Sequence, residues 1–192
     1  DVFALNAPYN GGTHLPDITV VTPVFDDRDD EILFWTASRG HHADVGGTAP
    51  GSMTPLATTV DEEGILFDNF QIVERGRFRE AELHVLLTDH PYPARNPRQN
   101  IADLKAQIAA NEKGAAELRK MVTHFGLEVV EAYMGHVQDN AAESVRRVLE
   151  RLPDSSEYEY PTDTGQVIKV RITVDRANRQ ATVDFTGTSP VM

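Results

Sequence analysis

The sequence of 192 residues contains no cysteine. This absence excludes disulfide scaffolds, thiolate catalysis and zinc sites built on cysteine, so a metal would have to bind histidine, carboxylate, carbonyl or water ligands. Long apolar runs are also missing, and candidates such as residues 18–21 have only the length of a strand. Because a membrane helix needs about 20 apolar residues, we expect no membrane-spanning segment.

Basic side chains are scarce, since 18 lysines and arginines stand against 30 aspartates and glutamates, giving a formal net charge of -12. No basic face for a phosphate backbone is evident, which argues against nucleic acid as a partner. The 40% hydrophobic residues predict a globular chain with a substantial core. No signal-peptide pattern is present, so we expect the cytoplasm. The chain begins at Asp1 in what resembles a strand, from which we expect a fragment of a longer protein.

Three regions differ in the spacing of their apolar residues. Residues 1–95 alternate short apolar runs with Gly, Pro, Asn and Asp, which predicts strands joined by long loops. In residues 96–152 the apolar side chains recur at helical spacing, which predicts two long amphipathic helices in an antiparallel hairpin, with Gly126 between them. Residues 153–192 alternate apolar and polar side chains, which predicts a β-hairpin. The expected fold class is α+β, with strands at residues 2–5, 18–25, 32–37, 65–73, 168–174 and 181–185.

The densest group of unusual residues is NAPYNGGTHLPD, residues 6–17. Its two adjacent glycines allow the backbone to turn tightly, and His14 and Asp17 are spaced so that both could bind one ion. In the alternative interpretation, His14 hydrogen-bonds a loop carbonyl and Asp17 caps the turn before the next strand. This loop alone does not decide between the two.

A second cluster, RGHHADVGG (residues 39–47), follows a predicted strand. Loops at strand ends often carry functional residues, so we expect the two clusters to converge on one site. Imidazole and carboxylate ligands suit divalent Mn, Zn or Fe. Because neighbouring side chains in an extended segment point to opposite faces, only one of His41 and His42 is expected to bind the metal. The other is then a supporting or substrate-contacting group.

These motifs resemble those of the hydantoinase B/oxoprolinase family, the B-type subunits or halves of ATP-dependent 5-oxoprolinases, N-methylhydantoinases and related carboxylases. The resemblance covers essentially the whole chain and is carried by NAPYNGGTHLPD, SRGHHADVGG, PGSM, EEGILFDNF, GRFRE, NPRQNIADLKAQIAAN and DFTGTSP. It implies a hetero-oligomer in which an A-type partner subunit binds ATP and phosphorylates the amide oxygen of a small cyclic amide. The B-type part then completes ring opening at a metal site.

The resemblance also implies that a His-x-x-Asp pair and a later histidine bind the metal, which maps onto His14, Asp17 and either His41 or His42. For the reaction we take His41 as the third ligand. The metal would then lower the pKa of a water molecule and polarise the activated carbonyl, while Asp44 or His42 moves protons.

Two departures from the family bear on this expectation. Many relatives carry aspartate where this chain has Ala7. Relatives are also longer, and a further carboxylate ligand in them comes from sequence upstream of Asp1, so the site of this chain is expected to be incomplete. Two other functions stay open: an ATP-dependent carboxylase of the acetone or acetophenone type, and a truncated non-catalytic domain that docks on the A-type partner through the helical hairpin.

Overall fold

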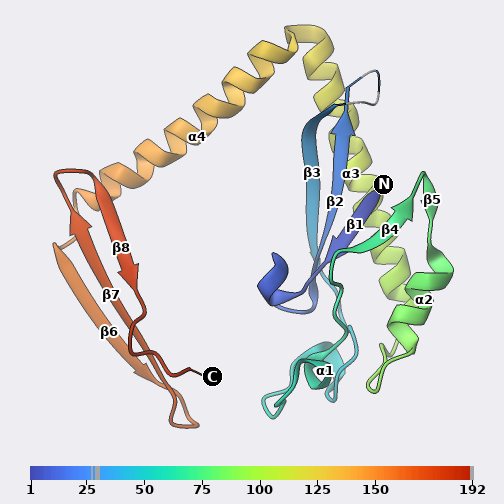
Figure 1. Cartoon of the computed structure of the whole chain (residues 1–192), viewed down its shortest axis with the longest axis horizontal. Coiled ribbons are helices and arrows are strands. Elements are labelled where there is room, and N and C mark those ends of the chain that lie inside the picture. The colour runs from blue at the N-terminus through green and yellow to red at the C-terminus, as the bar shows by residue number, and fades with distance from the viewer. Residues whose placement is uncertain (27, 29–30, 191–192) are drawn as a thin grey trace. The chain divides into compact units, whose positions relative to one another are not determined.

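The computed structural model of the chain describes residues 1–26, 28 and 31–190. The chain divides into two compact units, Asp1–Thr123 and His124–Met192, and each is described by itself (Figure 1). Within the described part of the chain, no helix combines the length and the apolar character needed to cross a bilayer.

The first unit is built on a five-stranded antiparallel sheet with the order β3-β2-β1-β4-β5. Buried residues alternate with half-buried ones along the second strand in sequence, the period expected where one face of a strand meets the core. The predicted strands at residues 2–5, 18–25 and 32–37 are therefore confirmed. The strands are β1 (Val2–Leu5), β2 (Asp17–Phe25), β3 (Ile32–His41), β4 (Phe70–Glu74) and β5 (Arg77–Phe78).

The apolar run at residues 65–73 is a strand only in its last part, β4. The first part of the run lies beside the buried side chain of Asn6. This side chain makes hydrogen bonds to the backbone there, in place of a neighbouring strand. Asn6 Oδ1 accepts a hydrogen bond from the Phe67 N–H at 2.7 Å, and Asn6 Nδ2 donates to the carbonyls of Leu15 and Ile65 at 2.8 and 2.9 Å. One amide thus satisfies three backbone groups that would otherwise be buried without partners.

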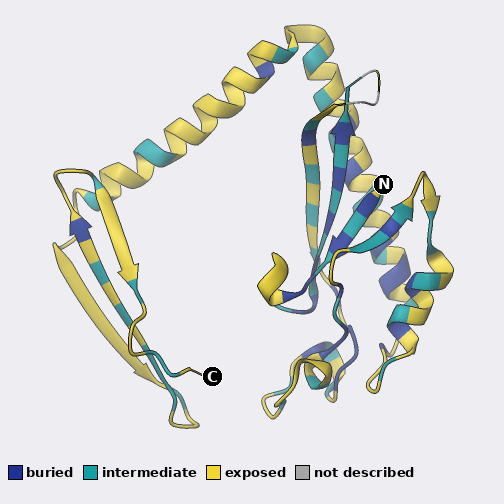
Figure 2. Ribbon diagram, viewed as in Figure 1, coloured by how far each residue is buried: buried dark blue, intermediate teal, exposed yellow. Residues whose placement is uncertain are grey.

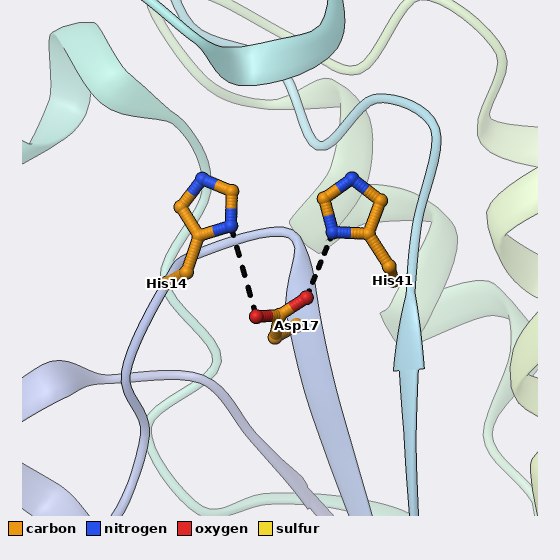
Figure 3. A group of neighbouring side chains, drawn as sticks. All are labelled: His14, Asp17 and His41. Atoms are coloured by element: carbon orange, nitrogen blue, oxygen red, sulfur yellow. Dashed lines mark hydrogen bonds and ion pairs between the residues drawn. The ribbon is translucent and has the colours of Figure 1, made fainter.

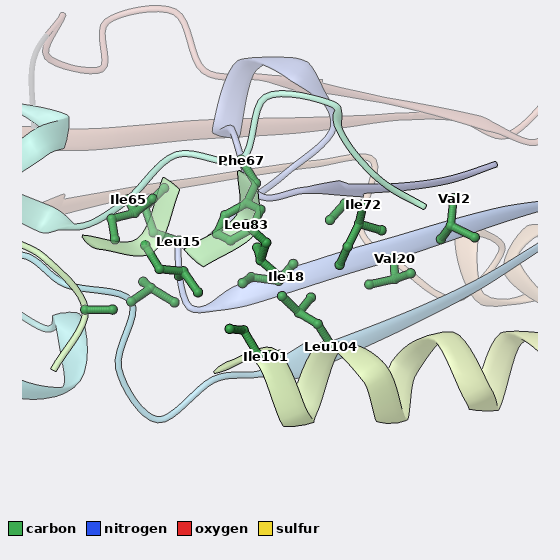
Figure 4. Close-up of a cluster of buried hydrophobic side chains, with 14 residues drawn as sticks. Val2, Leu15, Ile18, Val20, Ile65, Phe67, Ile72, Leu83, Ile101 and Leu104 are labelled. Atoms are coloured by element: carbon green, nitrogen blue, oxygen red, sulfur yellow. The ribbon is translucent and has the colours of Figure 1, made fainter. Parts of the chain in front are cut away.

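Three helices belong wholly or mostly to the first unit: α1 (Val60–Glu63), α2 (Glu80–Thr88) and α3 (Pro97–Phe125). The first two lie in the region for which the sequence predicts only strands and loops, whereas α3 matches its prediction. Figure 4 shows α3 beside β2, with side chains of both in the core. The core cluster comprises Val2, Ala4, Leu15, Ile18, Val20, Val45, Ile65, Phe67, Ile72, Leu83, Leu87, Ala94, Ile101 and Leu104.

Polar side chains of α3 also fix the helix on the sheet. Gln107 Nε2 donates to the carbonyls of Ile18 and Ser38 at 3.0 and 3.2 Å. Asn111 Nδ2 donates to the Val20 carbonyl at 2.9 Å. Each of these hydrogen bonds forms only when the helix lies at one position along β2 and β3. They therefore fix the position of α3 on the sheet more tightly than apolar contacts alone would.

The second unit consists of α4 (Leu127–Leu149) and a three-stranded antiparallel sheet of β6 (Ser155–Pro161), β7 (Val167–Asp175) and β8 (Gln180–Asp184). The sequence predicts β7 and β8 as a hairpin, and the structure corrects this by adding β6. The segment SSEYEYP contains no aliphatic residue, which hides its strand character. Among the described residues of this unit, the buried apolar side chains are Val130 and Val174, and Figure 2 shows mostly exposed ribbon.

The α+β class is confirmed. Gly126 separates α3 from α4 with φ of +86°, a left-handed conformation that glycine adopts without strain. Because the unit boundary follows Thr123, the antiparallel packing predicted for these helices stays a prediction. The division into residues 1–95, 96–152 and 153–192 likewise stays a prediction.

Candidate metal centre

The pairing of β2 with β3 creates one half of the site. In this register Asp17, the first residue of β2, lies directly opposite His41, the last residue of β3. His41 Nδ1 lies 2.8 Å from Asp17 Oδ1. Two residues 24 positions apart in the sequence therefore meet because of the strand register.

The loop before β2 supplies the other half. A tight turn, in which the Asp17 N–H donates to the His14 carbonyl at 2.8 Å, sets His14 on the same side as Asp17. The loop depends on Gly12, because a Cβ atom there would lie 2.0 Å from the carbonyl oxygen of Asn6. His14 Nδ1 lies 3.7 Å from Asp17 Oδ2, and the rings of His14 and His41 stack with centroids 5.6 Å apart.

Figure 3 shows the two imidazoles on either side of the carboxylate. One ligand atom from each of His14, Asp17 and His41 can be chosen so that all lie within 4.8 Å of one another. A metal about 2.1 Å from each ligand holds those ligands roughly 3 to 3.5 Å apart, so small side-chain movements bring this set to binding distance. The side chains are 41, 29 and 60% exposed, which leaves room for water or substrate.

The electrostatics of the cluster favour an ionised carboxylate. The hydrogen bond from His41 lowers the pKa of Asp17, and it outweighs the opposing effect of burial. Electrostatic interactions with His14, His41 and Arg39 also lower the pKa of Asp17. Asp17 is therefore available as an anionic ligand.

His14 has a further neighbour that the sequence does not indicate. Its Nε2 lies 3.1 Å from the thioether sulfur of Met53, whose side chain is exposed. Met53 belongs to the PGSM motif, but no spacing rule connects that motif with His14, so only the folded loop reveals the contact.

His42 lies on the opposite side of the strand end and is buried. Gln107 donates through its Nε2, so its Oε1 is the atom left to accept from His42 Nε2 at 3.1 Å. Asn100 Nδ2 lies 3.3 Å from His42 Nδ1, which makes that nitrogen the acceptor. These partners indicate a neutral ring protonated at Nε2, and burial lowers the pKa of His42.

The signal for these partners is present in the sequence. Asn100, Gln107 and Asn111 recur at helical spacing on the same side of α3 as Leu104. Amides in phase with apolar residues indicate hydrogen bonding to a buried partner. The sequence does not show which partner, because His42 lies 65 residues away from Gln107.

Asp44 holds the glycine-rich loop after β3. Its Oδ1 accepts the backbone N–H groups of Gly46 and Arg95, and its Oδ2 accepts the N–H of Gly51 and the Nη1 of Arg95 at 2.7 Å. Burial by itself would raise the pKa of Asp44, but these hydrogen bonds outweigh burial and lower it. All four donors belong to this chain, so the carboxylate organises the loop and the segment before α3.

The structure thus brings together His14, Asp17 and His41 and places His42 and Asp44 apart from them. Metal binding by the first three and proton transfer by the last two stay predictions.

Comparisons with known proteins identify a matching family and several similar proteins. A family model described as Hydantoinase B/oxoprolinase matches residues 1–192. The protein named 5-oxoprolinase 1 of Arabidopsis thaliana is 41% identical over 99% of this chain, and the 5-oxoprolinase of Dictyostelium discoideum is 42% identical over 97%. The chain spans only 17% and 15% of the lengths of these two relatives.

Two solved structures are similar to the chain. The ATP-dependent caprolactamase from Pseudomonas jessenii matches with a TM-score of 0.79 and 27% identity, over 95% of this chain and 31% of that one. A nucleotide-free acetone carboxylase, an enzyme of ATP-dependent acetone carboxylation, matches with a TM-score of 0.82 and 18% identity, over 98% of this chain and 26% of that one. The second likeness shows the fold alone.

Proposed function

The chain belongs to the hydantoinase B/oxoprolinase family, and on this premise we propose that it forms the metal-binding part of a hydrolase that opens a cyclic amide. The relatives at 41 and 42% identity are named for 5-oxoproline, and a solved structure at 27% identity is named for caprolactam. Both compounds are cyclic amides. The acetone carboxylase, at 18% identity, supports a shared scaffold and adds no support for carboxylation.

The observation that carries the proposal is the convergence of His14, Asp17 and His41. A divalent Mn, Zn or Fe ion bound there would lower the pKa of a water molecule and polarise the amide carbonyl. In the protein itself, Asp17 holds the ring of His41 and the turn from His14 to Asp17 sets the position of the second imidazole.

Supporting roles follow for the residues behind the cluster. His42 fixes the end of β3 on α3 through Gln107 and Asn100, and so fixes the neighbouring His41. Asp44 orders the following loop through Arg95 and two backbone N–H groups. For either side chain to transfer protons, as the sequence predicts, it would first have to leave these partners.

We further propose that an A-type partner subunit carries out the ATP-dependent activation of the substrate. The assembly is placed in the cytoplasm by the same proposal. Support comes from the ATP dependence stated for the caprolactamase and from the small share of each relative that the chain spans. The chain would then contribute the hydrolytic site to a larger hetero-oligomeric assembly.

Metal analysis tests the proposal. The purified chain, loaded in turn with Mn, Zn and Fe(II), should retain about one metal ion after gel filtration, measured by elemental analysis. Changing a group that only supports a metal ligand typically lowers the metal affinity by roughly 10–100-fold. Because His14 and Asp17 are proposed as ligands themselves, we expect His14→Ala and Asp17→Ala to lower the affinity by more than this. His84→Ala is the matched control, because His84 is an exposed histidine on α2.

Far-UV circular dichroism should be the same for all four proteins, since the altered side chains are at least partly exposed. In the complete enzyme containing this chain, the two cluster variants should lose turnover while His84→Ala retains it. Equal metal retention by the wild type and the cluster variants, or full turnover by the cluster variants of the complete enzyme, would contradict the proposed metal centre.

A further inference from the structure

Arg39 lies beside the candidate metal centre. It precedes His41 by two residues in β3, so both side chains leave the same face of the strand. The register places Arg39 opposite Thr19, just as it places His41 opposite Asp17. The two cross-strand pairs are therefore neighbours on one face of the sheet.

Two hydroxyl groups hold the guanidinium group in place. Arg39 Nε donates to Thr19 Oγ1 at 2.8 Å, and Nη1 donates to Thr13 Oγ1 at 3.3 Å. Thr13 immediately precedes His14, so the same loop that brings an imidazole to the cluster also positions Arg39. The guanidinium group is thereby directed by both parts of the site.

These partners leave the positive charge of Arg39 without a bonded counter-ion. Across the described ranges of the chain, no carboxylate forms an ion pair with Arg39, whereas Arg79 pairs with Glu82 and Arg95 with Asp44. Both hydroxyls are neutral acceptors. Since a guanidinium group has five N–H donors and two are used, three remain on Nη1 and Nη2.

We propose that Arg39 binds an oxyanion group of the substrate beside the candidate metal centre, either a carboxylate or a phosphoryl group. The inference rests on the proposed function and specifies its substrate class. The cyclic amide 5-oxoproline, for which the relatives are named, carries a carboxylate, and ATP-dependent activation of the amide oxygen adds a phosphoryl group. Either group presents two oxygens to the planar fork of a guanidinium group.

Ligand titration of the purified chain tests the proposal. The metal-free protein is used, so that no anion binds by coordinating a metal. Three ligands are compared: 5-oxoproline, inorganic phosphate, and 2-pyrrolidinone, which has the same ring as 5-oxoproline but no carboxylate. Binding is followed through the NMR signals of the imidazole rings of His14 and His41, which report on this site.

The wild type should bind 5-oxoproline or phosphate, and whichever binds more tightly identifies the oxyanion. We expect Arg39→Gln to weaken that binding by about tenfold or more, the loss of one charge-assisted hydrogen bond, and Arg39→Lys to retain part of it. Binding of 2-pyrrolidinone should not depend on Arg39. Arg119→Gln, an exposed arginine near the opposite end of β2, should behave as the wild type.

Equal anion binding by the wild type and Arg39→Gln, or no response of the two imidazoles in the wild type, would overturn the inference. Metal retention by Arg39→Gln is measured in parallel and should equal that of the wild type. If metal binds but anions do not, only the role of Arg39 fails. If anions bind but the chain retains no metal, the oxyanion site stands independently of the metal centre.

Discussion

At the scale of single residues, buried amides decide much of this structure. Asn6 connects three backbone groups in the core, and Asn100 and Gln107 hold the ring of His42. A polar group in the core is stable only when its hydrogen bonds are made, so each of these side chains ties one segment to another. The candidate metal centre depends on them indirectly, because they position the loop before β2 and the end of β3.

We expect Asn6→Ala to destabilise the first unit by about 2 to 4 kcal/mol, because it leaves the Phe67 N–H and two carbonyls unpaired in the core. Urea denaturation followed through the fluorescence of Trp35, the single tryptophan, measures this. Asn10→Ala is the control, since Asn10 is exposed and should change stability by less than about 0.5 kcal/mol. A similar small change for Asn6→Ala would show that water replaces its hydrogen bonds.

At the scale of elements, an ion-pair network joins α4 to the end of the turn before β8. Arg179 donates two hydrogen bonds to the carboxylate of Glu143, at 3.0 and 3.1 Å, and its Nε lies 3.0 Å from Glu150 Oε1. The hydrogen bond from Arg179, followed by that from Arg147, lowers the pKa of Glu143 from 4.5 to about 2. The second unit buries few apolar side chains, so these contacts matter to how its helix meets its sheet.

This pKa shift predicts a dependence of stability on pH. Because folding lowers the pKa of Glu143, its contribution is fully present above pH 4.5 and is lost as the pH falls toward 2. We expect the β8 amide signals to disappear at lower temperature at pH 3 than at pH 6, as measured by NMR.

In Glu143→Gln that difference between pH 3 and pH 6 should shrink. In Glu131→Gln, which changes an exposed glutamate of the same helix, it should match the wild type. An unchanged pH dependence in Glu143→Gln would show that solvent screens the pair completely.

At the scale of the whole molecule, the two units differ in how much they bury. The first unit packs fourteen residues into one apolar cluster, while the described residues of the second unit bury Val130 and Val174 as their apolar side chains. Since burial of apolar area is the main source of folding free energy, the units should differ in stability.

Hydrogen exchange measures this difference. Each sheet has a strand hydrogen-bonded on both sides, β2 in the first unit and β7 in the second. Comparing β2 with β7 therefore compares two strands that have neighbours on both sides. We expect amides of β2 to exchange at least about tenfold more slowly than those of β7 after correction for intrinsic rates. Equal protection would mean that the two units open together.

The sequence by itself determined the α+β class, most of the strands and the helix break at Gly126, because these follow from local periodicity and backbone preference. It also paired His14 with Asp17, which are three residues apart. The alternation of side chains along a strand shows that His41 and His42 face opposite ways.

Only the tertiary structure decided which of the two histidines joins the cluster. The register of β2 with β3 sets His41 against Asp17, and the amides of α3 hold His42 inside. The same holds for Asp44, whose partner Arg95 lies 51 residues away, and for β6, whose strand character depends on pairing with β7. These contacts join segments far apart in the sequence, and their energies exist only once the chain is folded, so no local pattern encodes them.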